Sequence, residues 1–91
     1  MRRSILETYI DVLTVLASEE SIKITHLMYK TNMNASLLKK YVKYLISQGL
    51  IEERNFEKQR TVYAITPRGK TVLKYFKELK QMLPFAEIEQ P

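Results

Sequence analysis

Apolar residues recur every three or four positions near the start of the chain, and this spacing predicts a first helix. Ser4 and Glu7 have the spacing of a capping box, which marks the helix start. The helix is expected to end near Ala17 or Ser18. Its apolar side carries Ile5, Leu6, Tyr9, Ile10, Leu13, Leu16 and Ala17, while Val12 and Val15 fall off this side.

Two further helices are predicted between residues 21 and 49. The β-branched run 21–24 is compatible with one small strand. Thr25 is then expected to cap a second helix of about two turns. Asn34 can cap a third helix that runs to about Gln48. Gly49 follows the expected end of this helix, a position that favours a residue in the left-handed backbone conformation.

After residue 49 the apolar positions alternate, which is the pattern of strands. Residues 50–56 and 60–65 are therefore expected to form a hairpin whose tip, 57–59, is charged. Tyr63 and Ile65 should share one face of it.

Thr66 and Pro67 predict the start of a last helix, with threonine as the cap and proline in the first turn. The expected helix covers about residues 67–83. Its apolar stripe is Val72, Phe76, Leu79 and Leu83. Pro84 should stop it, and residues 85–91 are expected to be a loose tail.

Length and composition limit the function classes. The 91 residues suffice for one domain, expected over residues 1–84. The chain has no cysteine, so disulfides and cysteine-based zinc sites are excluded. Its apolar runs are too short for a membrane span, and a cytoplasmic protein is expected. The formal net charge of +5 favours an acidic partner, nucleic acid first and an anionic membrane surface second.

Several short motifs occur in a set order along the chain: Met28-Tyr-Lys30, Met33-Asn34, Leu38-Lys-Lys-Tyr41, Leu45, Gly49-Leu-Ile51 and Tyr63-Ala-Ile-Thr-Pro-Arg-Gly69. Together with the element order, these motifs resemble small winged helix-turn-helix DNA-binding proteins of archaea and their MarR-like and PadR-like relatives. The resemblance implies an α+β, mainly helical fold with a three-helix core, a two-stranded wing and a long C-terminal helix. It also implies binding to double-stranded DNA, usually as a dimer formed through terminal helices.

The third helix is the expected DNA reader because residues 21–51 contain five lysines and no acidic residue. With Leu38 at the centre of its buried face, a rotation of about 100° per residue places Lys40 and Lys43 outward. The helix start should lie nearest to base edges and the lysines nearest to phosphates. The expected contacts in this helix are Asn34, Ala35, Ser36, Lys39, Lys40, Lys43 and Tyr44. The alternative is that these lysines only face solvent and contact no DNA.

The wing is expected to supply a second contact, on the backbone or in the minor groove. Its candidate residues are Arg54, Lys58, Gln59 and Arg60. Neighbouring glutamates argue against part of this hairpin touching DNA. The third helix has no arginine, and its only glutamine stands at its end, so strong base readers are scarce and modest sequence specificity is expected.

The last helix carries a broad apolar band that predicts a homodimer interface. The expected interface residues are Val72, Tyr75, Phe76, Leu79, Met82 and Leu83. The alternative is that this helix only covers the core. A dimeric DNA-binding transcription regulator is the leading interpretation. A protein-interaction module and a low-specificity architectural DNA-binding protein are its rivals. No enzyme constellation, metal site, cofactor site or small-molecule site is evident in the sequence.

Overall fold

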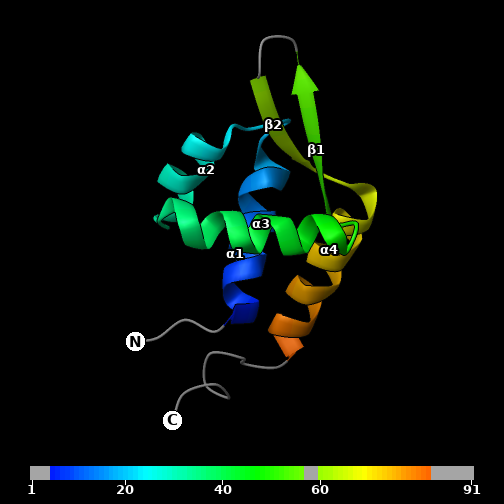
Figure 1. The fold of residues 1–91 in the computed structure, drawn as a ribbon. Coiled ribbons are helices and arrows are strands. Elements are labelled where there is room, and N and C mark those ends of the chain that lie inside the picture. Colours follow the sequence, from blue (N-terminus) through cyan, green and yellow to red (C-terminus); the bar gives the residue numbers. More distant parts are fainter. Residues whose placement is uncertain (1–4, 57–59, 83–91) are drawn as a thin grey trace.

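Three helices, a two-stranded antiparallel sheet and a fourth helix follow one another along the part of the chain that the structure describes (Figure 1). The structure is a computed structural model that describes residues 5–56 and 60–82. The elements are α1 (Ile5–Ser18), α2 (Ile24–Thr31), α3 (Ala35–Ser47), β1 (Ile51–Phe56), β2 (Arg60–Ile65) and α4 (Pro67–Met82). This order confirms the predicted winged helix-turn-helix architecture, in which β1 and β2 form the wing.

The predicted start and end of the third helix are confirmed. The Asn34 side chain accepts a hydrogen bond from the Leu37 backbone N–H at 2.9 Å, so it caps α3. Gly49 follows α3 with φ of 75°, a left-handed conformation that glycine adopts without strain. The residues that connect α3 to the wing are therefore encoded locally.

The start of α2 differs from the prediction. The helix begins at Ile24, and the capping position is Lys23, which makes no side-chain capping hydrogen bond. Thr25 therefore lies inside the first turn. Ser4 and residues 83–91 lie outside the described residues, so the predicted capping box and the loose tail are not described.

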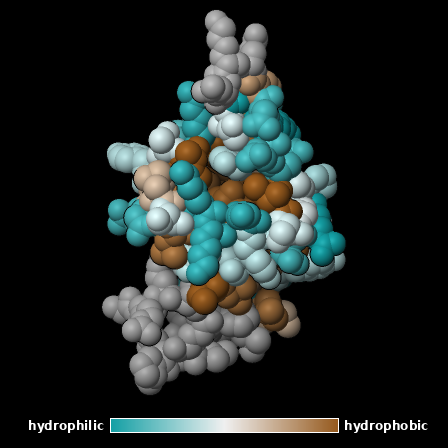
Figure 2. Space-filling view, in the orientation of Figure 1, coloured by the Kyte–Doolittle hydropathy of each residue, from teal (hydrophilic) through white to brown (hydrophobic). Residues whose placement is uncertain are grey.

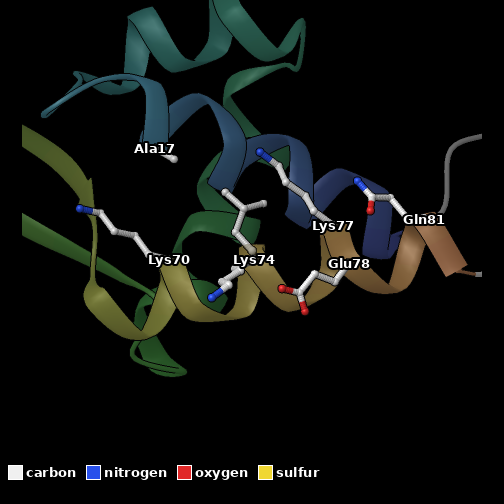
Figure 3. A pocket seen from close by; sticks show the side chains of 7 residues that line it. Ala17, Lys70, Lys74, Lys77, Glu78 and Gln81 are labelled. Carbon is white, nitrogen blue, oxygen red and sulfur yellow. The ribbon is translucent and has the colours of Figure 1, made fainter.

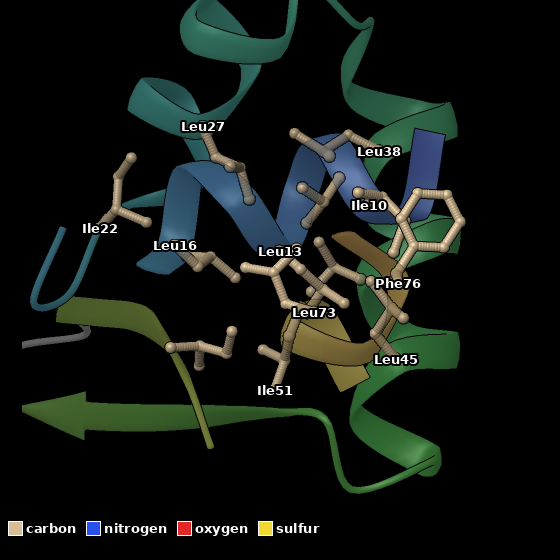
Figure 4. Close-up of a cluster of buried hydrophobic side chains, with 13 residues drawn as sticks. Ile10, Leu13, Leu16, Ile22, Leu27, Leu38, Leu45, Ile51, Leu73 and Phe76 are labelled. Carbon is tan, nitrogen blue, oxygen red and sulfur yellow. The ribbon is translucent and has the colours of Figure 1, made fainter. Parts of the chain in front are cut away.

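The core lies where α1, α3, α4 and the base of the wing meet (Figure 4). Leu13 and Leu16 of α1 are almost completely buried in it. The buried residues from the other elements are Ile22, Leu27, Leu38, Val42, Leu45, Ile51, Ile65, Leu73 and Phe76. These side chains come from every helix and both strands, so a single core holds the described elements together.

The buried side of α1 is only partly the predicted one. Val12, which lies off the predicted apolar side, is fully buried at 0% exposure. Ile5 and Leu6 are 60% and 42% exposed because the first turn of α1 extends past the core, and Ala17 is exposed at the other end. Helical periodicity identified the face but could not show where the neighbouring elements end.

The wing pairs in a continuous register from Ile51 opposite Ile65 to Phe56 opposite Arg60. Tyr63 packs against the core and Ile65 belongs to it, so the two share a face as predicted. Burial along β2 does not alternate, however, because Val62 and Ala64 are also buried. The predicted strand at 21–24 is a single bridge: Ile22 and Tyr63 exchange backbone hydrogen bonds of 3.0 and 2.8 Å. This bridge ties the loop before α2 to β2.

The start of α4 is attached to the turn that follows α3. The Thr66 hydroxyl accepts a hydrogen bond from the Gly69 N–H at 3.0 Å and donates one to the Gly49 carbonyl at 2.7 Å. The Thr66 N–H donates to the Leu50 carbonyl at 3.1 Å. Thr66 is therefore the predicted cap of α4 and also joins it to the base of the wing.

Candidate nucleic-acid interface

The outer face of α3 carries a row of free lysines. The opposite face packs into the core through three side chains that are at most 3% exposed, Leu38, Val42 and Leu45. Lys39, Lys40 and Lys43 are exposed, and no ion pair joins them to another described residue. The helix contains no acidic residue. The outer face therefore presents uncompensated positive charge, which is the condition for attracting phosphate.

The start of α3 is accessible, as a helix entering a groove requires. Asn34 and Ser36 are exposed, and Ala35 is half-buried. The Asn34 side-chain oxygen accepts the capping hydrogen bond with one of its two lone pairs, and its NH₂ group is free to donate to a base. The cap therefore fixes the orientation from which Asn34 can contact a base.

One flank of α3 is held by an aromatic cluster that the sequence did not predict. The rings of Tyr9 and Tyr44 stack with centroids 5.2 Å apart and an angle of 19°. Tyr41 meets Tyr9 edge-on, also at 5.2 Å. Tyr44 remains 48% exposed, so its ring is fixed against α1 while part of it faces solvent. The stacking of Tyr44 on Tyr9 orients α3 on α1. That Tyr44 contacts DNA stays a prediction.

The pKa of two tyrosines, Tyr9 on α1 and Tyr63 on β2, is raised above its ordinary value. Burial raises the pKa of Tyr9 above its ordinary value, and the nearby Tyr44 and Tyr41 raise it further. Burial also raises the pKa of Tyr63, and Glu53 raises it further through its charge and a hydrogen bond. Both phenols remain neutral hydrogen-bond donors at neutral pH.

The wing carries one of its candidate cations in an ion pair. The Arg54 guanidinium lies 2.7 Å from a Glu52 carboxylate oxygen, and both side chains are nearly half exposed. Arg60 is exposed at the start of β2. Lys58 and Gln59, the predicted tip contacts, lie outside the described residues. In the free protein, Arg54 is therefore partly neutralised by Glu52.

Replacing Glu52 with glutamine should strengthen DNA binding about two- to fivefold, because Arg54 no longer has to leave a carboxylate to reach a phosphate. The log–log salt slope should steepen by about one unit or less. Fluorescence anisotropy over a salt series measures both. Glu78→Gln is the matched control, since it removes the same charge from an exposed position on α4, about three helical turns beyond the end of the wing. Equal gains in both variants would attribute the effect to net charge and remove Arg54 from the interface.

The predicted dimer residues of α4 divide into two groups. Tyr75, Leu79 and Met82 are 64%, 43% and 78% exposed. Phe76 is 8% exposed and belongs to the core, and Val72 is half-buried against it. These two residues therefore differ from the prediction, because the inner side of α4 packs on α1. Leu83 lies outside the described residues.

An exposed apolar surface remains at one end of the molecule. Ile5 and Leu6 open α1, and Leu79 and Met82 close α4. Both helix ends lie at the lower end of Figure 1, and Figure 2 shows hydrophobic surface there. We call Tyr75, Leu79 and Met82 the α4 seam. Their spacing of four and three residues follows a heptad.

The α4 helix also carries positive charge that the sequence analysis missed. Arg68, Lys70, Lys74, Lys77 and Lys80 are all exposed, against one acidic residue, Glu78. The spacing of Lys70, Lys74 and Lys77 by four and three residues was a visible signal of a common flank. On α2, Tyr29 is 83% exposed beside Lys30.

Among residues 5–56 and 60–82, no group of three acidic or histidine side chains could hold a metal ion. None of the helices in these ranges is long and apolar enough to cross a membrane.

Comparisons with known proteins agree with the geometry. A family model described as winged helix-turn-helix matches residues 2–84. No curated protein matches the chain. Among solved structures, Sso10a-2, a DNA-binding protein from Sulfolobus solfataricus, is 26% identical with a TM-score of 0.72. The match covers 96% of this chain and 92% of that chain.

Longer proteins share the fold. A MarR family transcriptional regulator from Silicibacter pomeroyi is 19% identical with a TM-score of 0.70, and the match covers 82% of this chain and 54% of that one. BpsR from Bordetella bronchiseptica is 18% identical with a TM-score of 0.71, over 88% of this chain and 54% of that chain. The chain thus spans about half the length of these two proteins.

Proposed function

The chain belongs to the winged helix-turn-helix family, and on this premise we propose that it binds double-stranded DNA as a homodimer and acts as a transcription regulator. In this proposal α3 enters the major groove and the wing lies on the backbone or in the minor groove. The observation that carries the proposal is the outer face of α3. It presents Lys39, Lys40 and Lys43 without an acidic residue, opposite a fully buried apolar face.

In this proposal the parts of this surface have different tasks. The lysines supply sequence-independent attraction to phosphate, while the exposed start of α3 is nearest to base edges. Of the three residues there, Asn34 uses its side-chain oxygen to cap α3, and Ala35 has no polar side-chain group. Ser36 is therefore the one unoccupied polar side chain among them. We infer that base-specific contacts are few and that the protein works in the cytoplasm without catalysis.

Competition binding tests this function and its specificity. We expect nanomolar-to-micromolar binding to long duplex DNA at low salt. The ratio of specific to nonspecific affinity should be about 10³ or less, using a site selected from a random duplex pool. Absence of duplex binding at low salt would instead favour a protein-interaction module. A ratio of about 10⁶ would show that the wing or Ser36 reads bases far better than its chemistry indicates.

Dimerisation through the α4 seam is the second element of the proposal. The seam exposes three large apolar side chains in a heptad spacing, and Ile5 and Leu6 expose two more nearby. A second copy is the simplest cover for such a surface. Two linked copies would place their α3 helices in successive major grooves, about 34 Å apart.

Replacing Met82 with glutamate should convert the dimer to a monomer, because a twofold axis would bring two carboxylates together in an apolar contact. Duplex affinity should fall by about 10²-fold or more, since two linked half-sites become one. Sedimentation velocity and anisotropy measure the two effects. Gln81→Glu adds the same charge to the neighbouring exposed position and should leave the dimer intact.

Leu79→Glu is a second test of the seam, accompanied by a thermal melt because Leu79 is only 43% exposed. A wild-type protein that sediments as a monomer at micromolar concentration, or a Met82→Glu variant that still dimerises, would exclude the α4 seam as the interface.

A further inference from the structure

A groove between α1 and α4 is separate from both the outer face of α3 and the α4 seam. It has a volume of about 370 Å³ and is lined by Ala17 of α1 and by Lys70, Leu73, Lys74, Lys77, Glu78 and Gln81 of α4. Leu73 forms part of an apolar floor. Figure 3 shows Lys77 extending from α4 toward α1, whereas Lys74 and Glu78 point together away from α1.

The groove lies on a different flank of α4 from the seam. At about 100° per residue, Lys70 and Lys77 are within about 60° of Leu73 on one side. Tyr75 and Leu79 lie more than about 100° from Leu73 on the other side. A second copy bound along the seam would therefore leave the groove open.

The lining defines the chemistry of an occupant. Three lysines against one glutamate give the rim a formal charge of about +2, and no ion pair joins these lysines to another described residue. The apolar floor favours hydrophobic side chains. The matching partner is thus a short peptide in which apolar side chains alternate with carboxylates.

The chain itself contains such a sequence directly after α4. Residues 83–91 read Leu-Pro-Phe-Ala-Glu-Ile-Glu-Gln-Pro, so Phe85 and Ile88 accompany Glu87 and Glu89. Leu73 lies nine residues before Met82, which is about 13 Å along the helix axis. The six residues from Met82 to Ile88 can span about 20 Å, enough to turn at Pro84 and return to Leu73.

We propose that residues 83–91 bind in the groove between α1 and α4 of their own chain, with apolar side chains on the floor and glutamates beside Lys70 and Lys77. The docked segment would cover the apolar floor at Leu73 and neutralise part of the positive charge of α4. The inference concerns this groove alone and does not depend on DNA binding by α3.

Disulfide trapping tests the proposal, because the chain has no native cysteine. The pair Ala17→Cys and Ile88→Cys should crosslink within one chain in the presence of oxidised glutathione, without DNA. A control pair, Ser47→Cys and Ile88→Cys, places the first thiol on the outer side of α3 and should crosslink at background yield. Circular dichroism confirms that each variant is folded.

Charge reversal then separates docking from random collision. Glu87→Lys with Glu89→Lys should lower the yield of the Ala17–Ile88 crosslink about fivefold, the order supplied by two exposed ion pairs. Adding Lys70→Glu with Lys77→Glu should restore it. A yield equal to the control pair, an insensitivity to charge reversal, or a crosslink only between two copies would overturn the proposal.

Discussion

Replacing Lys40 and Lys43 together with alanine should weaken duplex binding about 10- to 100-fold at 0.1 M salt, and the log–log salt slope should become shallower by about two units. Each lysine lost from a phosphate contact leaves one more counterion condensed on the DNA, which accounts for about one unit of slope. Both residues are exposed on the face opposite Leu38 and Val42, so the melting temperature should hardly change.

The matched control is Lys74→Ala with Lys80→Ala, which removes the same charge from exposed positions on α4. If binding depends on α3, this control should lose only the small, long-range part of the affinity. Anisotropy titrations at four or more salt concentrations give the slopes. An unchanged slope in the α3 variant, or equal losses in both variants, would show that α3 is not the DNA-binding face.

Replacing Gly69 with alanine should destabilise the protein strongly, although it adds only one methyl group. A Cβ at this position would overlap the Leu50 carbonyl oxygen and would lie 2.7 Å from Ile65 Cγ1. The first of these atoms is backbone and cannot rotate away, so α4 must move off the base of the wing. We expect a loss of about 2–4 kcal/mol in the free energy of unfolding. The melting temperature should fall by about 10 °C or more.

Gly49→Ala is the comparison, because its cost in stability comes from backbone conformation rather than from a steric overlap. Its φ is 75°, and an added Cβ would meet only Arg68 Cδ at 3.7 Å. The expected cost is about 1–2 kcal/mol. Thermal and urea unfolding measure both variants. A Gly69→Ala protein as stable as Gly49→Ala would mean that α4 is not held against the Leu50 carbonyl in the way the structure describes.

Local signals in the sequence predicted most of the secondary structure. Asn34 and Thr66 cap their helices with their own side chains, and Gly49 ends α3 through its backbone freedom. Such signals act over a few residues, so they are readable without knowing the fold. Thr25 does not cap α2, although its residue type favours capping, because the helix begins at Ile24, two residues earlier than a cap at Thr25 implies.

The outward direction of the α3 lysines was also predictable, because a helix with one apolar face has its opposite face determined by the period of 3.6 residues. The partners of the exposed side chains were not predictable in this way. Arg54 pairs with Glu52, and Tyr44 stacks on Tyr9 from another helix. These contacts depend on strand geometry and on how α1 crosses α3.

The sequence by itself determined the element order, the caps of α3 and α4, the basic helix and its outward face, because each follows from residue chemistry within a few positions along the chain. The tertiary structure decided which apolar residues are core and which are left exposed. Phe76 is buried and Met82 is exposed although both lie on the predicted band, since α4 extends beyond the element it packs against. It also decided that residue 69 must be glycine, because the Leu50 carbonyl approaches it from a segment 19 positions away in the chain.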